Sequence, residues 1–169
     1  ISGAGSYLFL GFRSYKMIRS LHKIVLHPKK YYSNFHRRYH LGEYRPGLKV
    51  LALAENIVND GFKKAKDNKN LAIHEFAHVP YFETKGKNSW EALRFQWGFR
   101  KLGDIFDDKQ RLNNMMGSGY FRAYGTMNRY EFLSVLTENY VETPELFHSR
   151  YPEVFRILLK MYNFNPLNN

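Results

Sequence analysis

His74, Glu75 and His78 are the residues whose types and spacing could do chemistry, because they form the pentad His-Glu-Phe-Ala-His inside the apolar run Leu71–Val79. On a helix, residues four apart share one face, so the two imidazoles can aim at one point. A catalytic zinc site takes three protein ligands and keeps one position open. Glu75 would project beside such a metal, where its carboxylate can take a proton from a zinc-activated water. The pentad therefore predicts a hydrolytic site with one Zn²⁺ per chain.

The residues around the pentad favour the helix that this chemistry needs. Asp67, Asn68 and Asn70 precede it and are candidate N-caps. Apolar side chains then follow at helical spacing. Pro80 comes two residues after the second histidine, and we expect it to end or kink the helix there.

Two histidines leave a zinc ion short of one protein ligand. The remaining donors in the later sequence are carboxylates, and a helix predicted from Asn128 to about Glu142 contains Glu131, Glu138 and Glu142. Glu131 and Glu138 are seven residues apart and so face the same side of that helix. One of them could bind the metal while the other hydrogen-bonds a ligand histidine. The spacing alone does not decide which.

The composition predicts a single folded domain covering residues 1–169. The chain is 44% hydrophobic and 17% aromatic, and it has no cysteine, which excludes disulfides, thiolate ligands and a cysteine nucleophile. No apolar run is long enough to span a membrane, and no signal peptide is visible. We therefore expect a cytoplasmic protein. The chain opens on Ile1 rather than Met, so we read it as lacking an upstream region, which leaves an upstream membrane anchor open.

Positive charge is concentrated in the first third of the chain. Residues 1–50 contain ten Lys or Arg against a single acid, Glu43. The stretch from Lys29 to His40 alternates cations with aromatics, a pattern typical of single-strand nucleic-acid grooves and of patches that bind anionic membranes. No nucleic-acid fold motif accompanies it. We therefore predict a solvated basic face whose aromatics pack inward, with nucleic acid or membrane binding as the less favoured alternative.

The order of the predicted elements indicates an α+β domain. Two segments read as strands, Lys23–His27 and Gly47–Ala54, and the second is a candidate edge strand for aligning an extended peptide. Asp107–Gly125 looks irregular, and we expect it to form a mobile rim of the active site. Ser6–Phe12 is too short for periodicity to assign. The helices predicted after the pentad are Trp90–Phe106, Asn128–Glu142 and two that start at Pro144 and Pro152.

The segment from Ala123 to Phe132 resembles the MtfA-like zinc peptidases, named for the Mlc titration factor. In that family a tyrosine precedes a Glu-Phe pair by the interval that separates Tyr124 from Glu131. A second glutamate follows seven residues on, as Glu138 does, and then a Pro-x-Leu helix start, matched here at Pro144. The resemblance extends upstream to residues 70–78 and 23–28, and residues 1–11 are similar to the first helix of the family's catalytic domain. The Tyr-to-Glu spacing also resembles the catalytic domain of anthrax lethal factor.

The resemblance implies a zincin-like, gluzincin-like metallopeptidase domain with a small N-terminal sheet, an HExxH active-site helix and a helical C-terminal part. It implies that Glu131 is the third zinc ligand and that Glu138 supports a ligand histidine. Tyr124 becomes a candidate electrophile beside the metal. Many members have a small residue and then Leu-Asp after the second histidine, whereas this chain has residues 79–83 (Val-Pro-Tyr-Phe-Glu) there. Glu83 is only a weak substitute for that aspartate.

Two functions follow as hypotheses. The first is a zinc-dependent metallopeptidase that hydrolyses peptide bonds in a peptide or protein substrate, with Glu75 as the general base. The second is a metal-containing regulatory module that captures a partner protein such as a transcriptional repressor, which the family resemblance permits. A module that only binds a partner would not need Glu75, so the sequence favours the enzyme.

Overall fold

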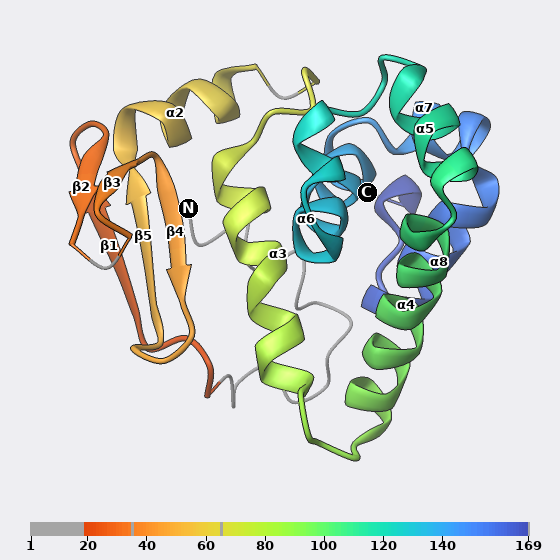
Figure 1. Ribbon diagram of the computed structural model, residues 1–169, viewed down its shortest axis with the longest axis horizontal. Helices are drawn as coiled ribbons and strands as arrows, with labels where there is room; N and C mark the ends of the chain where they lie inside the picture. The colour runs from red at the N-terminus through yellow and green to blue at the C-terminus, as the bar shows by residue number, and fades with distance from the viewer. Residues whose placement is uncertain (1–18, 35, 65, 169) are drawn as a thin grey trace.

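The chain folds into a small N-terminal sheet packed against a larger helical part (Figure 1). This computed structural model describes residues 19–34, 36–64 and 66–168. The run Ser6–Phe12 and the helix expected over residues 1–11 lie outside these ranges. Helices and a small sheet together agree with the predicted α+β class.

Three strands form the main sheet, β1 (Lys23–His27), β5 (Val50–Ala54) and β4 (Gly42–Arg45), in the order β1-β5-β4. Strand β1 is parallel to β5, and β4 is antiparallel to it. The prediction that the segment ending in β5 is an edge strand is wrong, because β5 is the central strand. Its sequence, Val-Leu-Ala-Leu-Ala, is apolar on both faces, which suits a strand covered on both sides. The edge strand next to the helices is β4.

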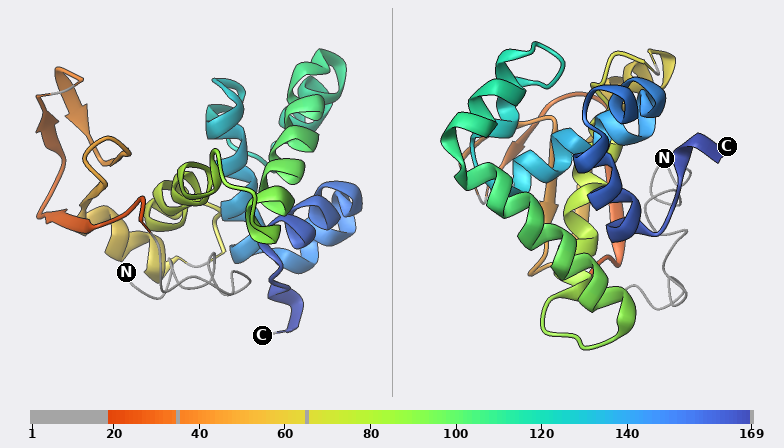
Figure 2. Two further views of the ribbon diagram at one scale, coloured as in Figure 1. Left: turned by 90° about the horizontal axis from the view of Figure 1, so that it is seen from below. Right: turned by 90° about the vertical axis from the view of Figure 1, so that its right-hand side faces the viewer.

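The basic and aromatic stretch forms a separate antiparallel hairpin of β2 (Tyr31–Ser33) and β3 (Arg38–His40), which stands away from the helices (Figure 2). The expectation that its aromatics pack inward is wrong for Tyr32 and Tyr39. These side chains are 51% and 66% exposed, and their ring centroids lie 5.5 Å apart. A two-stranded sheet has only one face to turn toward the core, so the residues opposite one another on its other face remain in solvent.

The helical part follows the sheet in chain order. The helices are α2 (Glu55–Lys63), α3 (Leu71–Thr84), α4 (Trp90–Asp107), α5 (Lys109–Gly117), α6 (Arg129–Glu142), α7 (Pro144–Arg150) and α8 (Pro152–Tyr162), with short 3₁₀ turns η2 (Ala123–Thr126) and η3 (Pro166–Asn168). Among the described residues, none of the helices is long and apolar enough to cross a membrane. The predicted helix starts at Asn128, Pro144 and Pro152 are confirmed.

Helix α3, which contains the pentad, lies between the sheet and helices α4 to α8 (Figure 1). The Asn70 side chain caps it by accepting a hydrogen bond from the Ile73 amide at 3.2 Å. Of the two outcomes expected at Pro80, the end of the helix is wrong, because α3 continues to Thr84; a kink there stays a prediction. Pro80 is buried, and its carbonyl accepts a hydrogen bond from the Thr84 hydroxyl at 2.8 Å. Packing around the helix therefore outweighs the one backbone hydrogen bond that proline cannot make.

The segment Asp107–Gly125 is largely helical, so the prediction of an irregular segment is wrong. Asp108 caps α5 by accepting a hydrogen bond from the Arg111 amide at 3.1 Å. Leu112 and Met115, three residues apart, are both buried against the core. Turn η2 then leads into α6.

Aromatic side chains fill much of the core between α4, α6 and α8. Aromatic side chains bury about 150–250 Å² each and dominate the energetics of a core. The largest completely buried side chains are Tyr140, Tyr162, Phe95, Phe132, Phe147 and Phe155. This packing holds α6 against α4 and α8, and α6 in turn contacts α3, which is the contact that forms the site.

Candidate metal centre

Helices α3 and α6 bring three side chains that could hold a metal ion to one point. His74 and His78 come from α3, Glu131 comes from the first turn of α6, and one ligand atom of each lies within 4.8 Å of the others. His74 Nε2 is 2.9 Å from Glu131 Oε2, and His78 Nε2 is 4.0 Å from Glu131 Oε1. Asn128 caps α6 by accepting from the Glu131 amide at 3.0 Å, which fixes where this side chain leaves the helix.

The chemistry of these donors suits a divalent metal. Two imidazole nitrogens and one carboxylate oxygen form the donor set of catalytic zinc sites that keep a fourth position open. Glu142, the third candidate carboxylate, lies elsewhere and accepts a hydrogen bond from the Asn70 side-chain amide at 3.1 Å. The residues present therefore fit a metal held by His74, His78 and Glu131.

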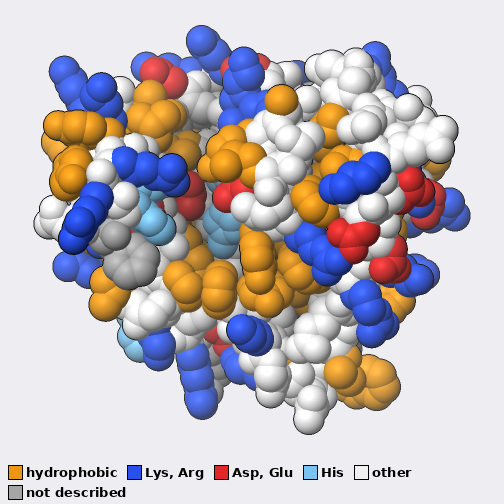
Figure 3. Space-filling view, in the orientation of Figure 1, with side chains coloured by type: hydrophobic (Ala, Val, Ile, Leu, Met, Phe, Trp, Pro, Cys, Tyr) orange, Lys and Arg blue, Asp and Glu red, His pale blue; other side chains and the backbone are white. Residues whose placement is uncertain are grey.

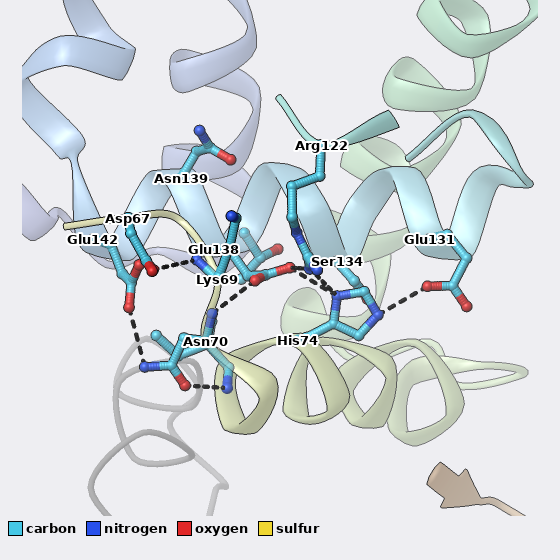
Figure 4. Close-up of polar contacts among 12 residues, drawn as sticks. Asp67, Lys69, Asn70, His74, Arg122, Glu131, Ser134, Glu138, Asn139 and Glu142 are labelled. Carbon is cyan, nitrogen blue, oxygen red and sulfur yellow. Dashed lines mark hydrogen bonds and ion pairs between the residues drawn. The ribbon is translucent and has the colours of Figure 1, made fainter. Parts of the chain in front are cut away.

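A completely buried carboxylate, Glu138, fixes the ring of His74 (Figure 4). His74 Nδ1 lies 2.8 Å from Glu138 Oε1, so its N–H can donate to this carboxylate, and Nε2 is the ring nitrogen that faces Glu131 and would bind a metal once its own proton is displaced. Arg122 donates to the same oxygen and forms an ion pair with Glu138. The backbone amide of Asn70 donates to Glu138 Oε2 at 2.8 Å. One carboxylate thus joins the start of α3, a metal-facing histidine and an arginine.

The two histidines have opposite electrostatic environments. Burial by itself would lower the pKa of His74, but hydrogen bonds to Glu131 and Glu138 outweigh it and raise that pKa to about 9. Burial, aided by the neighbouring positive charge of His74, lowers the pKa of His78 to about 4. A metal ion would have to displace a proton from His74 and would meet a neutral His78.

Glu75 lies beside the cluster and is held against strand β4. It is 8% exposed, and burial raises its pKa to about 7, partly offset by the charge of His74. That range suits a group that must both take and return a proton near neutral pH. Gly42 of β4 packs directly on it, and a Cβ at Gly42 would lie 2.7 Å from Glu75 Cγ and 2.8 Å from Leu71 Cδ1. The strand can approach Glu75 this closely because residue 42 has no side chain.

Tyr124 is on turn η2, and its ring lies beside that of His74. Its ring centroid is 5.7 Å from that of His74, and the side chain is 44% exposed. Burial and the nearby charge of Glu131 raise the pKa of Tyr124, so its hydroxyl keeps its proton at neutral pH and can donate a hydrogen bond.

These groups open into a cleft of about 460 Å³ between the hairpin, strand β4, helix α3 and turn η2. In Figure 3, His and acidic side chains lie at the floor of a hollow in this face, and Lys and Arg side chains gather beside it over the β2–β3 hairpin. Its lining residues are Arg38, Tyr39, His40, Leu41, Gly42, Ile57, Lys69, Leu71, His74, Glu75, Arg122, Tyr124 and Met127. A cleft of this size can hold several residues of an extended peptide.

Sequence reasoning missed Arg122 and Ser134. Ser134 Oγ lies 3.4 Å from His78 Nε2, and Ser134 is one turn after Glu131 on the same face of α6, a spacing that could have revealed it. Arg122 has no such signal, because it reaches Glu138 from a turn. Glu83, considered as a substitute for an aspartate, instead accepts hydrogen bonds from the Arg19 and Ser20 amides at 2.7 and 2.8 Å.

The fold and the site together define a class, an α+β domain that presents a His-His-Glu cluster with a carboxylate beside it. The model of the family described as glucose-regulated metallo-peptidase M90 matches residues 1–163, so the chain belongs to that family. The predicted resemblance to MtfA-like peptidases is thereby confirmed.

The chain is also similar to an uncharacterized protein, slr2042, of the cyanobacterium Synechocystis sp. (strain ATCC 27184 / PCC 6803 / Kazusa). The two are 25% identical over 123 residues, which cover 70% of this chain and 45% of the relative. The matched region thus spans less than half the length of that curated relative.

Proposed function

We propose that this chain is a zinc-dependent peptidase with a zincin-like catalytic domain, in which His74, His78 and Glu131 hold the metal and Glu75 is the general base. The observation that supports it most is the convergence of the three donor atoms within 4.8 Å beside a buried carboxylate that is not one of them. Membership of a metallopeptidase family supports peptides or proteins as the substrates.

In the proposed hydrolysis the metal and the side chains of the protein have different roles. A bound zinc ion supplies Lewis-acid chemistry that lowers the pKa of water and polarises a carbonyl. Glu75 takes the proton of the attacking water and returns it to the leaving amine as the C–N bond breaks. Glu138 keeps His74 in one tautomer and one orientation throughout.

Strand β4 supports a particular path for the substrate. It is one of the two edge strands of the three-stranded sheet, the one next to α3, and Gly42 at its start lines the cleft beside Glu75. An extended peptide can add to such an edge through main-chain hydrogen bonds. This path would place the scissile bond over Glu75.

The Tyr124→Phe variant should cleave peptides more slowly but not lose activity. The hydroxyl of Tyr124 can donate to the oxyanion that develops at the scissile carbonyl, and losing one such donor costs about 10²–10³ in kcat in other hydrolases. The measurement is kcat and KM on one peptide for both proteins. A change in KM alone, with kcat unchanged, would show that Tyr124 only binds substrate.

The Gly42→Ala variant should lose activity without losing metal. Its methyl group would meet Glu75 Cγ at 2.7 Å and push the base out of place, and a misplacement of about 1 Å can cost about 10²-fold in rate. The matched control is Gly47→Ala, where an added Cβ has no atom within 4 Å. Equal rates for Gly42→Ala and wild type would show that β4 does not position Glu75.

Metal content is the direct test of the proposed site. Wild type and Glu131→Ala would be purified in parallel without chelator and analysed for metals, then assayed on a peptide library with and without added zinc. We expect about one zinc per wild-type chain, a sharp loss in the variant, and cleavage that follows zinc content. A wild type that binds no metal even after reconstitution would overturn the proposal, and full zinc in Glu131→Ala would shift the third ligand to another residue.

A further inference from the structure

The walls of the cleft are positively charged, and part of that charge has no acidic partner. Three cations line it, Arg38, Lys69 and Arg122, and the only acid among its lining residues is Glu75 at the floor. Arg122 is already paired with Glu138. Neither Arg38 nor Lys69 forms an ion pair among the described residues, and the residues outside the described ranges (1–18, 35, 65 and 169) include no Asp or Glu. Two charges therefore face the cleft uncompensated.

These two cations come from different segments that line the cleft, and they differ in what holds them. Arg38 is on strand β3, and its Nε donates to His40 Nε2 at 3.1 Å, which leaves the two terminal nitrogens of its fork for a ligand. Burial lowers the pKa of His40, which keeps that ring neutral and able to accept. Lys69 immediately precedes the cap of α3, and its amide is bound by Asp67 at 3.0 Å. Both side chains are exposed and can move toward a ligand in the cleft.

We propose that the cleft binds a carboxylate of the peptide substrate through Arg38 and Lys69, so that the enzyme prefers acidic peptides. This inference rests on the proposed peptidase function for its substrate, but the carboxylate site can be tested without catalysis. A carboxylate is the anionic group that a peptide can present, and a guanidinium fork binds it with two parallel hydrogen bonds. The group comes either from an Asp or Glu side chain near the scissile bond or from the free C-terminus.

The test uses peptides in matched pairs. One pair differs by Glu against Gln at a position near the scissile bond, and a second pair differs by a C-terminal acid against an amide. Binding is measured by fluorescence anisotropy to the zinc-loaded Glu75→Gln protein, and cleavage is measured with the wild type. We expect the acidic member of one pair to bind and be cleaved about tenfold better, as one charge-assisted hydrogen bond provides. The pair that shows the preference identifies the source of the carboxylate.

Substitutions of the two cleft-lining cations, compared with substitutions of two exposed cations nearby in the sequence, show which residues cause the acidic preference. Arg38→Ala and Lys69→Ala should each shrink the acidic preference, whereas Arg37→Ala and Lys66→Ala should leave it unchanged, because these exposed neighbours do not line the cleft. A preference reduced equally by all four variants would indicate only the general positive field of the chain and would overturn the site.

The outcomes separate the two proposals. Cleavage that needs Glu75 but treats both members of every pair alike would overturn the carboxylate site and leave the peptidase standing. Tighter binding of the acidic member, lost in Arg38→Ala and without any Glu75-dependent cleavage, would support the carboxylate site and contradict the peptidase.

Discussion

The Glu75→Gln variant should lose nearly all peptidase activity while keeping its metal and its fold. Glutamine has almost the same shape, so the contacts with Gly42 and strand β4 are preserved. Its amide cannot accept a proton from the attacking water, and general acid–base catalysis contributes about 10²–10⁴ in rate. Because Glu75 is not in the donor cluster, zinc content should not fall. The measurements are kcat, zinc per chain and the thermal midpoint.

The control for this substitution is Glu145→Gln, which changes the same residue type on the exposed surface of α7. It should leave all three quantities at their wild-type values. Undiminished cleavage by Glu75→Gln would overturn the assignment of the base. If cleavage is absent from the wild type as well, while the protein retains a metal, the regulatory module that captures a partner becomes the better hypothesis.

The sequence predicted the local parts of the site because their chemistry depends on short spacings. His74 and His78 share a face of α3 for the reason that residues four apart always do, and Asn70 caps that helix as one of the predicted candidates. The start of α6 at Asn128 was readable from its capping side chain and the apolar spacing that follows. The choice of Glu131 over Glu138 was not readable from spacing and came from the family resemblance.

The wrong predictions and the missed residue share one cause. Contacts between distant parts of the chain decide each of these features, and a local sequence pattern does not contain those contacts. Pro80 reads as a helix end, yet burial on several sides keeps α3 intact to Thr84. The strand β5 was assigned to an edge because its pairing partners are not visible in its own sequence. Arg122 reaches Glu138 across 16 positions of sequence, and no periodicity links a turn to a helix at that distance.

The Glu138→Ala variant should weaken both the fold and the metal site, in contrast to Glu131→Ala. Glu138 is completely buried and accepts from the Asn70 amide, His74 and Arg122, so alanine would leave three donors without their acceptor. Unsatisfied buried donors cost about 1–3 kcal/mol each, and the partial exposure of Arg122 lets water satisfy that one. We expect the metal-free protein to lose about 3 kcal/mol of unfolding free energy in urea. Loss of the partner of a ligand histidine should also weaken zinc binding about 10–100-fold.

A neighbouring acid separates the two effects. Glu142→Gln changes a carboxylate four residues further along α6 that binds the Asn70 side chain and makes no contact with His74. This variant should lower the free energy of unfolding but leave zinc affinity unchanged, because Glu142 acts only on the start of α3. Glu131→Ala should chiefly weaken zinc binding and cost less stability than Glu138→Ala, since the Glu131 carboxylate is partly exposed and, among the described residues, accepts from no buried donor other than His74. If Glu138→Ala abolished zinc binding while Glu131→Ala retained it, Glu138 would be the metal ligand and Glu131 the hydrogen-bond partner of His74. The metal ligand on α6 would then lie two helical turns further from the cleft.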